Sequence, residues 1–145
     1  MRRKGFTYVE LIVVLAILAG LTALVVPSFS RTIASARLRA SASDVRSTFA
    51  RARALAVISA QERSAVFDLS RGEFGVDNEA ARILPETTRL GAVLPGGDRL
   101  DQGSLRIRFF PDGGGEEAEI SVTAPDGGAL RVTVDPLTGL AEAGT

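Results

Sequence analysis

The sequence contains no cysteine and no histidine, and its only lysine is Lys4. Without cysteine there can be no disulfide framework and no thiolate metal site. Without histidine the chain lacks the commonest general base and metal ligand, so catalytic triads and histidine-containing zinc sites are excluded. We therefore expect no catalytic residues, no cofactor and no metal site. A membrane-anchored enzyme has no supporting group of residues.

The net charge of zero conceals a strong asymmetry along the chain. Residues 1–63 carry a net charge of +7, whereas residues 64–145 carry −7. Such asymmetry says more about partners than the overall charge does. DNA binding would need a basic patch on the distal half, so DNA is not an expected partner.

The N-terminus combines a cationic start with a long apolar run. Arg2, Arg3 and Lys4 are followed by sixteen residues without a charge, from Leu11 to Val26. About 20 apolar residues cross the hydrocarbon core as a helix, and basic residues stay on the cytoplasmic side. We expect residues 6–27 to cross a membrane once, with a cytoplasmic N-terminus and an extracytoplasmic C-terminal domain.

Two simpler interpretations of this terminus are a secretory signal peptide and a plain membrane anchor. A small-residue cleavage pattern occurs at residues 34–36, but it lies eight residues past Val26, which is far for a signal peptide. Glu10 fits neither interpretation, because a carboxylate in or near the bilayer costs about 2–3 kcal/mol. Some other group is expected to compensate this charge.

The stretch from Gly5 to Leu18, Gly-Phe-Thr-Tyr-Val-Glu-Leu-Ile-Val-Val-Leu-Ala-Ile-Leu, resembles the signature of type IV prepilins and type II secretion pseudopilins. The resemblance implies that residues 1–5 are a leader, that prepilin peptidase cleaves between Gly5 and Phe6, and that Phe6 is then N-methylated. It also implies that Glu10 mediates subunit assembly and that Pro27 bends the helix. The implied partners are prepilin peptidase, other pseudopilins or pilins in a hetero-oligomeric filament, and membrane lipid before assembly. The implied location is the cell inner membrane, with the C-terminal domain in the periplasm.

The region after the apolar run predicts a continuation of the same helix. Between Pro27 and Gly72 lie 44 residues with neither glycine nor proline. Apolar residues recur there at alternating steps of four and three, as on one face of a helix; they are Leu38, Ala42, Val45, Phe49, Ala52 and Ala56. We predict one helix from about Phe6 to about Ala60, with residues 28–62 as its amphipathic half.

Residues 63–145 predict a β-rich domain, because glycine and proline divide them into short segments. Alternating apolar and polar residues predict strands at 65–69, 73–77, 105–109, 120–122 and 130–134, with one more near 90–94. We expect the strands at 105–109, 120–122 and 130–134 to form a meander that packs on the helix. The expected fold class is α+β, a long N-terminal helix packed on a small antiparallel β-sheet domain, as in pilins.

Two segments of this half, Arg106–Gly113 and Val132–Gly139, resemble the GspH/FimT-like pseudopilins. The resemblance implies a minor pseudopilin, a structural subunit of the type II secretion pseudopilus that supports protein export. The alternative is a minor pilin of a type IV pilus or competence system, acting in adhesion, motility or DNA uptake. A stripe on the outer face of the sheet could then contact DNA, and its candidate residues are Arg106, Arg108 and Arg131.

Two further groups of charges have competing interpretations. The acidic residues around Gly113–Gly115 could suit Ca²⁺, but their spacing is not that of an EF-hand, so we interpret them as a solvated turn; they are Asp112, Glu116, Glu117 and Glu119. We interpret Arg46, Arg51 and Arg53 as a solvated helix face. For Arg31, Arg37 and Arg39, a solvated face and a basic ridge for lipid or an acidic partner both remain open.

Overall fold

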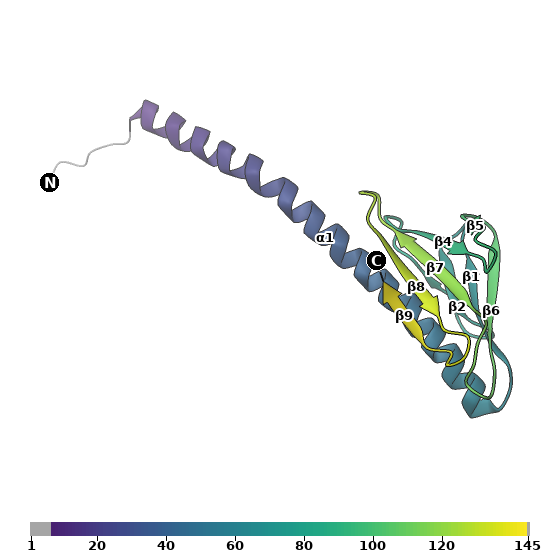
Figure 1. Cartoon of the computed structure of the whole chain (residues 1–145). Coiled ribbons are helices and arrows are strands. Elements are labelled where there is room, and N and C mark those ends of the chain that lie inside the picture. The colour runs from purple at the N-terminus through teal and green to yellow at the C-terminus, as the bar shows by residue number, and fades with distance from the viewer. Residues whose placement is uncertain (1–6, 145) are drawn as a thin grey trace. The chain divides into compact units, whose positions relative to one another are not determined.

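The computed structural model describes the backbone of residues 7–144, and their side chains apart from those of residues 22–31. Within this range the chain forms one helix and nine strands (Figure 1). They are α1 (Tyr8–Ser59), β1 (Arg63–Asp68), β2 (Glu73–Val76), β3 (Arg82–Ile83), β4 (Arg89–Val93), β5 (Arg99–Leu100), β6 (Ser104–Phe109), β7 (Ala118–Thr123), β8 (Ala129–Val134) and β9 (Ala141–Gly144). One compact unit ends at Ala34, and a second begins at Ser35 and includes the rest of α1 and all of these strands.

Local capping interactions define both ends of α1. At the start, the Thr7 hydroxyl oxygen accepts a hydrogen bond from the backbone N–H of Glu10 at 3.3 Å, which satisfies a free N–H of the first turn. At the end, Ala60 adopts a left-handed conformation with φ of 52°. The Gln61 N–H donates to the Ala56 carbonyl at 3.3 Å, the pattern of a Schellman cap. The predicted helix is therefore confirmed, with its described boundaries close to those expected.

The apolar stripe predicted along the helix is confirmed as the part of α1 that enters the core. All six of its residues are buried, and Val45, Phe49, Ala52 and Ala56 are completely inaccessible to solvent. The Phe49 ring packs against two strand residues, with centroids 5.3 Å from Phe67 and 6.0 Å from Phe109. Aromatic pairs at such distances add to the stabilisation that apolar burial provides.

The strands form two antiparallel sheets. The first has four strands in the order β3-β2-β1-β6, and the second has five in the order β5-β4-β7-β8-β9. Inward residues of both sheets and of α1 belong to one apolar core. The expected α+β class, a long helix packed on antiparallel β-structure, is confirmed.

The expected meander of three strands is wrong at its first step. β6 pairs with β1, with Ala65 opposite Ile107, whereas β7 and β8 lie in the other sheet. The physical reason is that β6 alternates polar and apolar residues along its whole length, and this pattern does not determine which strand lies next to it. The turn 110–116 therefore carries the chain from one sheet to the other. The meander of three consecutive strands is instead β7-β8-β9, and it lies in the second sheet.

The strands predicted at 65–69 and 73–77 are confirmed as the antiparallel pair β1 and β2, and the strand predicted near residues 90–94 is confirmed as β4. Three short strands were not expected from the sequence. β3 and β5 have two residues each, and β9 consists of Ala-Glu-Ala-Gly. Alanine, glutamate and glycine are depleted in strands, so only pairing with β8 makes this tail a strand.

Candidate assembly surfaces

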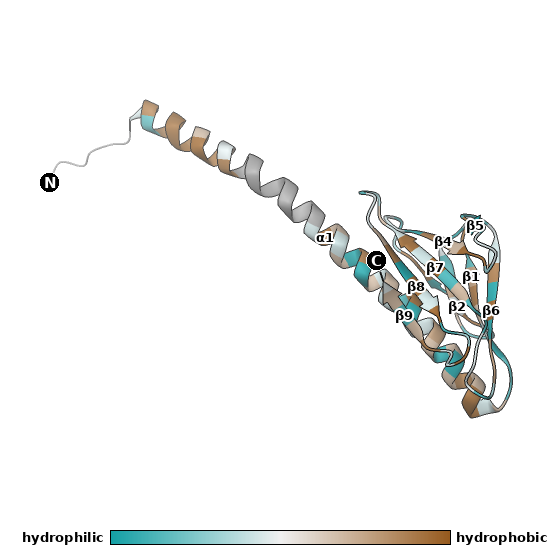
Figure 2. Cartoon of the chain, viewed as in Figure 1, coloured by the Kyte–Doolittle hydropathy of each residue, from teal (hydrophilic) through white to brown (hydrophobic). Residues whose placement is uncertain are grey.

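The first part of α1 presents apolar side chains that no other part of the described chain covers. From Leu11 to Leu21 its large hydrophobic residues are 42–57% exposed, and most of this part of the helix is coloured hydrophobic in Figure 2. Because residues 11–15 are all large and apolar, they lie on every side of the helix. A helix that is apolar all round is normally buried in lipid or in protein. The described helical residues alone do not make a segment long and apolar enough to span a bilayer.

Glu10 lies in the first turn of α1 and is exposed. Its carboxylate forms no ion pair with another described residue, and its backbone N–H is held by Thr7. A negative charge near a helix N-terminus is favourable because of the helix dipole. The predicted cleavage residues Gly5 and Phe6 lie outside the described residues. Pro27 is part of α1, but its side chain is outside the described part.

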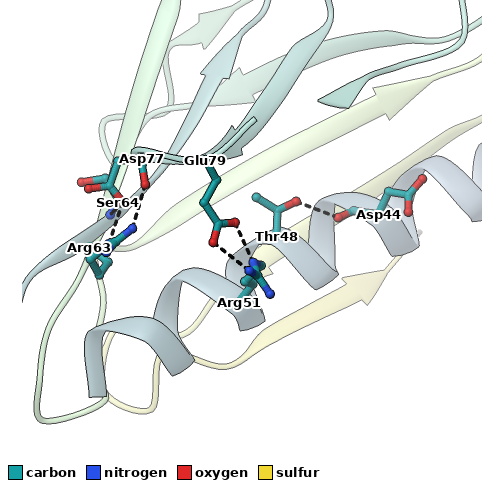
Figure 3. Close-up of polar contacts among 7 residues, drawn as sticks. All are labelled: Asp44, Thr48, Arg51, Arg63, Ser64, Asp77 and Glu79. Carbon is teal, nitrogen blue, oxygen red and sulfur yellow. Dashed lines mark hydrogen bonds and ion pairs between the residues drawn. The ribbon is translucent and has the colours of Figure 1, made fainter. Parts of the chain in front are cut away.

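One flank of α1 is tied by one ion pair to the loop between β2 and β3 (Figure 3), and by another to β3. The Arg51 guanidinium donates two hydrogen bonds to the Glu79 carboxylate, at 2.6 and 2.7 Å, and Arg82 lies 3.4 Å from Asp44. The hydrogen bonds from Arg51 hold the pKa of Glu79 below its ordinary value and raise the pKa of Arg51. The loop is held at its other side by Arg63, whose Nε donates to Asp77 at 3.0 Å.

The other flank of α1 holds two turns through one arginine. The Nε–H of Arg53 is shared between the carbonyl oxygens of Gly113, at 2.9 Å, and Thr138, at 2.8 Å. The two turns also contact each other directly, because the Gly115 N–H donates to the Pro136 carbonyl at 3.0 Å. The interpretation of Arg53 as a solvated residue is therefore wrong. Arg46 is exposed as expected, and Arg51 is exposed but paired.

Three residues of the acidic turn have separate, local partners, whereas Glu117 is exposed and has no ion pair with another described residue. The Glu116 carboxylate accepts hydrogen bonds from the Arg108 guanidinium and backbone N–H, and the contact with Arg108 lowers the pKa of Glu116. Asp112 accepts from the Gly114 N–H at 3.0 Å, and Glu119 lies 3.4 Å from Arg131. Within the described part of the chain, no group of three or more acidic residues is arranged to hold a metal ion.

The three arginines considered for DNA contact do not form one stripe. Arg106 and Arg108 belong to β6 in one sheet, whereas Arg131 belongs to β8 in the other. Two of them already face carboxylates, as Arg108 pairs with Glu116 and Arg131 with Glu119. Of these three arginines, only Arg106 has no ion pair with another described residue, so the three do not form a continuous basic surface.

Two structural residues were not recognised from the sequence. Thr7 had a signal, because Thr-x-x-Glu at residues 7–10 matches the capping-box pattern. Arg53 had none, because its partners are backbone carbonyls of turns far away in the chain. Its position is nevertheless informative, since the turns that it joins belong to the segments Arg106–Gly113 and Val132–Gly139.

The comparison with known families identifies this distal part. The family described as type II transport protein GspH matches residues 41–138. The chain belongs to the GspH family. The match covers the buried half of α1 and both turns held by Arg53, and it begins after the apolar run. No curated protein and no solved structure was found to match the chain. GspH membership supports a pseudopilin-like, structural role as a membrane-associated component of type II secretion.

Proposed function

We propose that the chain is a minor pseudopilin that is assembled into a type II secretion pseudopilus and supports protein export. Family membership supports the secretion role. The observation that carries the assembly role is the apolar surface of α1 between Leu11 and Leu21, which is about half exposed in the isolated chain. Such a surface needs lipid before assembly and neighbouring helices afterwards.

In this proposal the subunit begins as a single-pass protein of the inner membrane. The sequence supports this step, because the run without charge continues past Leu21 to Val26 and follows three cationic residues. Prepilin peptidase then removes residues 1–5 by cleavage after Gly5, and the new terminus on Phe6 is methylated. The domain that follows α1 is on the extracytoplasmic side.

Glu10 has the central role in the proposed assembly step. Its carboxylate has no ion-pair partner among the described residues, and a buried charge is tolerated only when it is paired. The positive amine on Phe6 of a neighbouring subunit would supply that partner. The pair would fix the axial register of the subunits, as a buried polar residue fixes the register of a coiled coil.

Photo-crosslinking from Val14 in native membranes, followed by mass spectrometry, tests this function. Capture of type II secretion pseudopilins would support it. Capture of type IV pilus or competence subunits would support the alternative, a minor pilin. Adducts with lipid alone, without any pilin-like protein, would contradict both functions.

A Glu10 series separates assembly from insertion. We expect Glu10→Ala and Glu10→Gln to lose the Val14 crosslinks to other subunits, because neither side chain carries the negative charge that forms an ion pair with the amine. Both variants should stay in the membrane fraction. Glu10→Asp should retain part of the signal because it keeps the charge. Wild-type crosslinking in Glu10→Ala would contradict the role of the carboxylate.

A further inference from the structure

A surface groove follows one flank of α1, beside the turn that leads into β9. Its volume is about 380 Å³. We call it the α1–β9 groove, and its main lining residues are Ser43, Arg46, Ser47, Ala50, Leu140 and Ala141. β9 lies beside α1 at this place (Figure 1), so the groove has a helical wall and a strand wall.

The helical wall carries positive charge that the described chain does not neutralise. Arg39, Arg46 and Arg53 recur every seven residues, which places them on one flank of the helix. Arg53 is occupied by the carbonyls of the two turns. Arg39 and Arg46 are exposed, and neither forms an ion pair with a described residue. On the opposite flank, by contrast, Asp44 and Arg51 both have partners.

The strand wall is apolar and ends in an open sheet edge. Leu140 is 53% exposed and Leu137, in the same turn, is 89% exposed. β9 is the last strand of its sheet and pairs only with β8 among the described strands. Its outer edge therefore presents backbone N–H and C=O groups, which suit a polypeptide chain rather than a lipid headgroup.

Charge complementarity indicates what kind of polypeptide fits. The groove offers unpaired guanidinium groups beside aliphatic side chains, so an occupant with carboxylates next to apolar residues would match it. The distal half of this chain, residues 64–145, has a net charge of −7, whereas residues 6–63, which remain after the proposed cleavage, have +4. Subunits with this polarity would expose acidic segments to the basic flank of a neighbour in a filament.

We propose that the α1–β9 groove docks an acidic segment of a neighbouring pseudopilin subunit, with a carboxylate on Arg46 and an aliphatic side chain against Leu140. The proposal rests on the pseudopilin function and adds a second contact region to the one at Glu10. It also gives the open flank of α1 a role different from that of the flank tied to the β2–β3 loop.

The test uses a photoreactive residue at Ala50 in the full chain, in native membranes. Ala50 is exposed and lines the groove. The matched control is Ala80, an exposed alanine in the loop on the other flank. We expect Ala50 to capture a subunit at a peptide that mass spectrometry maps to a segment with Asp or Glu, and Ala80 to capture about tenfold less.

Charge reversal then tests the role of Arg46. We expect Arg46→Glu to lower the Ala50 adduct about tenfold, because a carboxylate would repel the docked segment, and Arg46→Lys to keep most of it. The proposal is overturned by an Ala50 adduct equal to that at Ala80, by adducts with lipid alone, or by a captured peptide without a carboxylate. An undiminished adduct in Arg46→Glu would also overturn it.

Parallel crosslinking from Val14 separates this inference from the function on which it rests. Capture from Val14 without capture from Ala50 would leave the pseudopilin role standing and reject the groove. Loss of both would reject the proposed function itself.

Discussion

The contact between Arg53 and its two turns depends on glycine at position 139. Gly139 has a φ of 62°, and a Cβ added there would lie 2.3 Å from the Gly113 carbonyl oxygen and 3.0 Å from Arg53 Cδ. The Gly113 oxygen is backbone and accepts a hydrogen bond from Arg53, so it cannot simply move aside. The close approach of the turns therefore requires a residue without a side chain.

Gly139→Ala should lower the free energy of unfolding by about 3 kcal/mol, which combines left-handed strain with backbone overpacking. The matched control is Gly97→Ala, because Gly97 has a φ of 87° but no atom within 4 Å of an added Cβ. It should cost only about 1 kcal/mol. Urea unfolding of both variants gives the comparison, and equal losses would mean that the approach of the turns is not tight.

The end of α1 offers the opposite change. Ala60 occupies the left-handed position that follows the helix, with a φ of 52°, where glycine carries no Cβ penalty. We expect Ala60→Gly to raise the free energy of unfolding by about 0.5–1 kcal/mol. Ala54→Gly, at an exposed position inside α1, should instead lower it by about 1 kcal/mol. Thermal unfolding distinguishes these outcomes, and destabilisation by both substitutions would contradict the assigned cap.

At the scale of elements, the helix and its core face could be predicted because helical periodicity is local. Each buried apolar residue of α1 lies three or four residues from the previous one. The pairing of β6 with β1 could not be predicted in the same way, because the intervening chain forms β2 to β5 and nothing local selects the partner. Arg46 and Arg53 also look alike in sequence, and only the turns opposite Arg53 make their roles differ.

The link between α1 and the β2–β3 loop should depend on pH through Glu79. The pKa of this carboxyl is lowered by its hydrogen bonds to Arg51. A lowered pKa means that the pair stabilises the fold above the unfolded-state pKa, and that this contribution disappears as the pH falls through the folded-state pKa. Because both side chains are partly solvated, the contribution is expected to be small.

We therefore expect Glu79→Gln to melt slightly below the wild type at pH 7, and the gap to close as the pH falls from about 5 to 3. Glu117→Gln is the control, since Glu117 is exposed and has no ion pair among the described residues. It should melt with the wild type throughout. A gap for Glu79→Gln that persists at pH 3 would show that the effect does not come from the ion pair.

At the scale of the whole molecule, the chain is divided between a part whose large apolar side chains are exposed and a part that has its own apolar core. Among the described side chains, the buried apolar ones all lie between Leu38 and Val134, within the unit that starts at Ser35. The exposed apolar residues of α1 from Leu11 to Leu21 lie in the other unit. The exposed apolar segment of α1 and the folding core are thus separate along the chain.

This division predicts that a chain beginning at Ser35 folds without detergent. It keeps every apolar residue that is buried in the described part of the chain, and it loses the segment from Leu11 to Leu21, whose apolar side chains are exposed. A chain beginning at Thr48 is the control, because it lacks Leu38, Ala42 and Val45, which are 8%, 2% and 0% exposed. Leu38 and Val45 alone represent about 3 kcal/mol or more of apolar burial, a large part of the stability of a small domain. Circular dichroism on heating should therefore show a cooperative transition for the first chain and none for the second. Failure of the first chain to fold would mean that the helix before Ser35 also stabilises the domain.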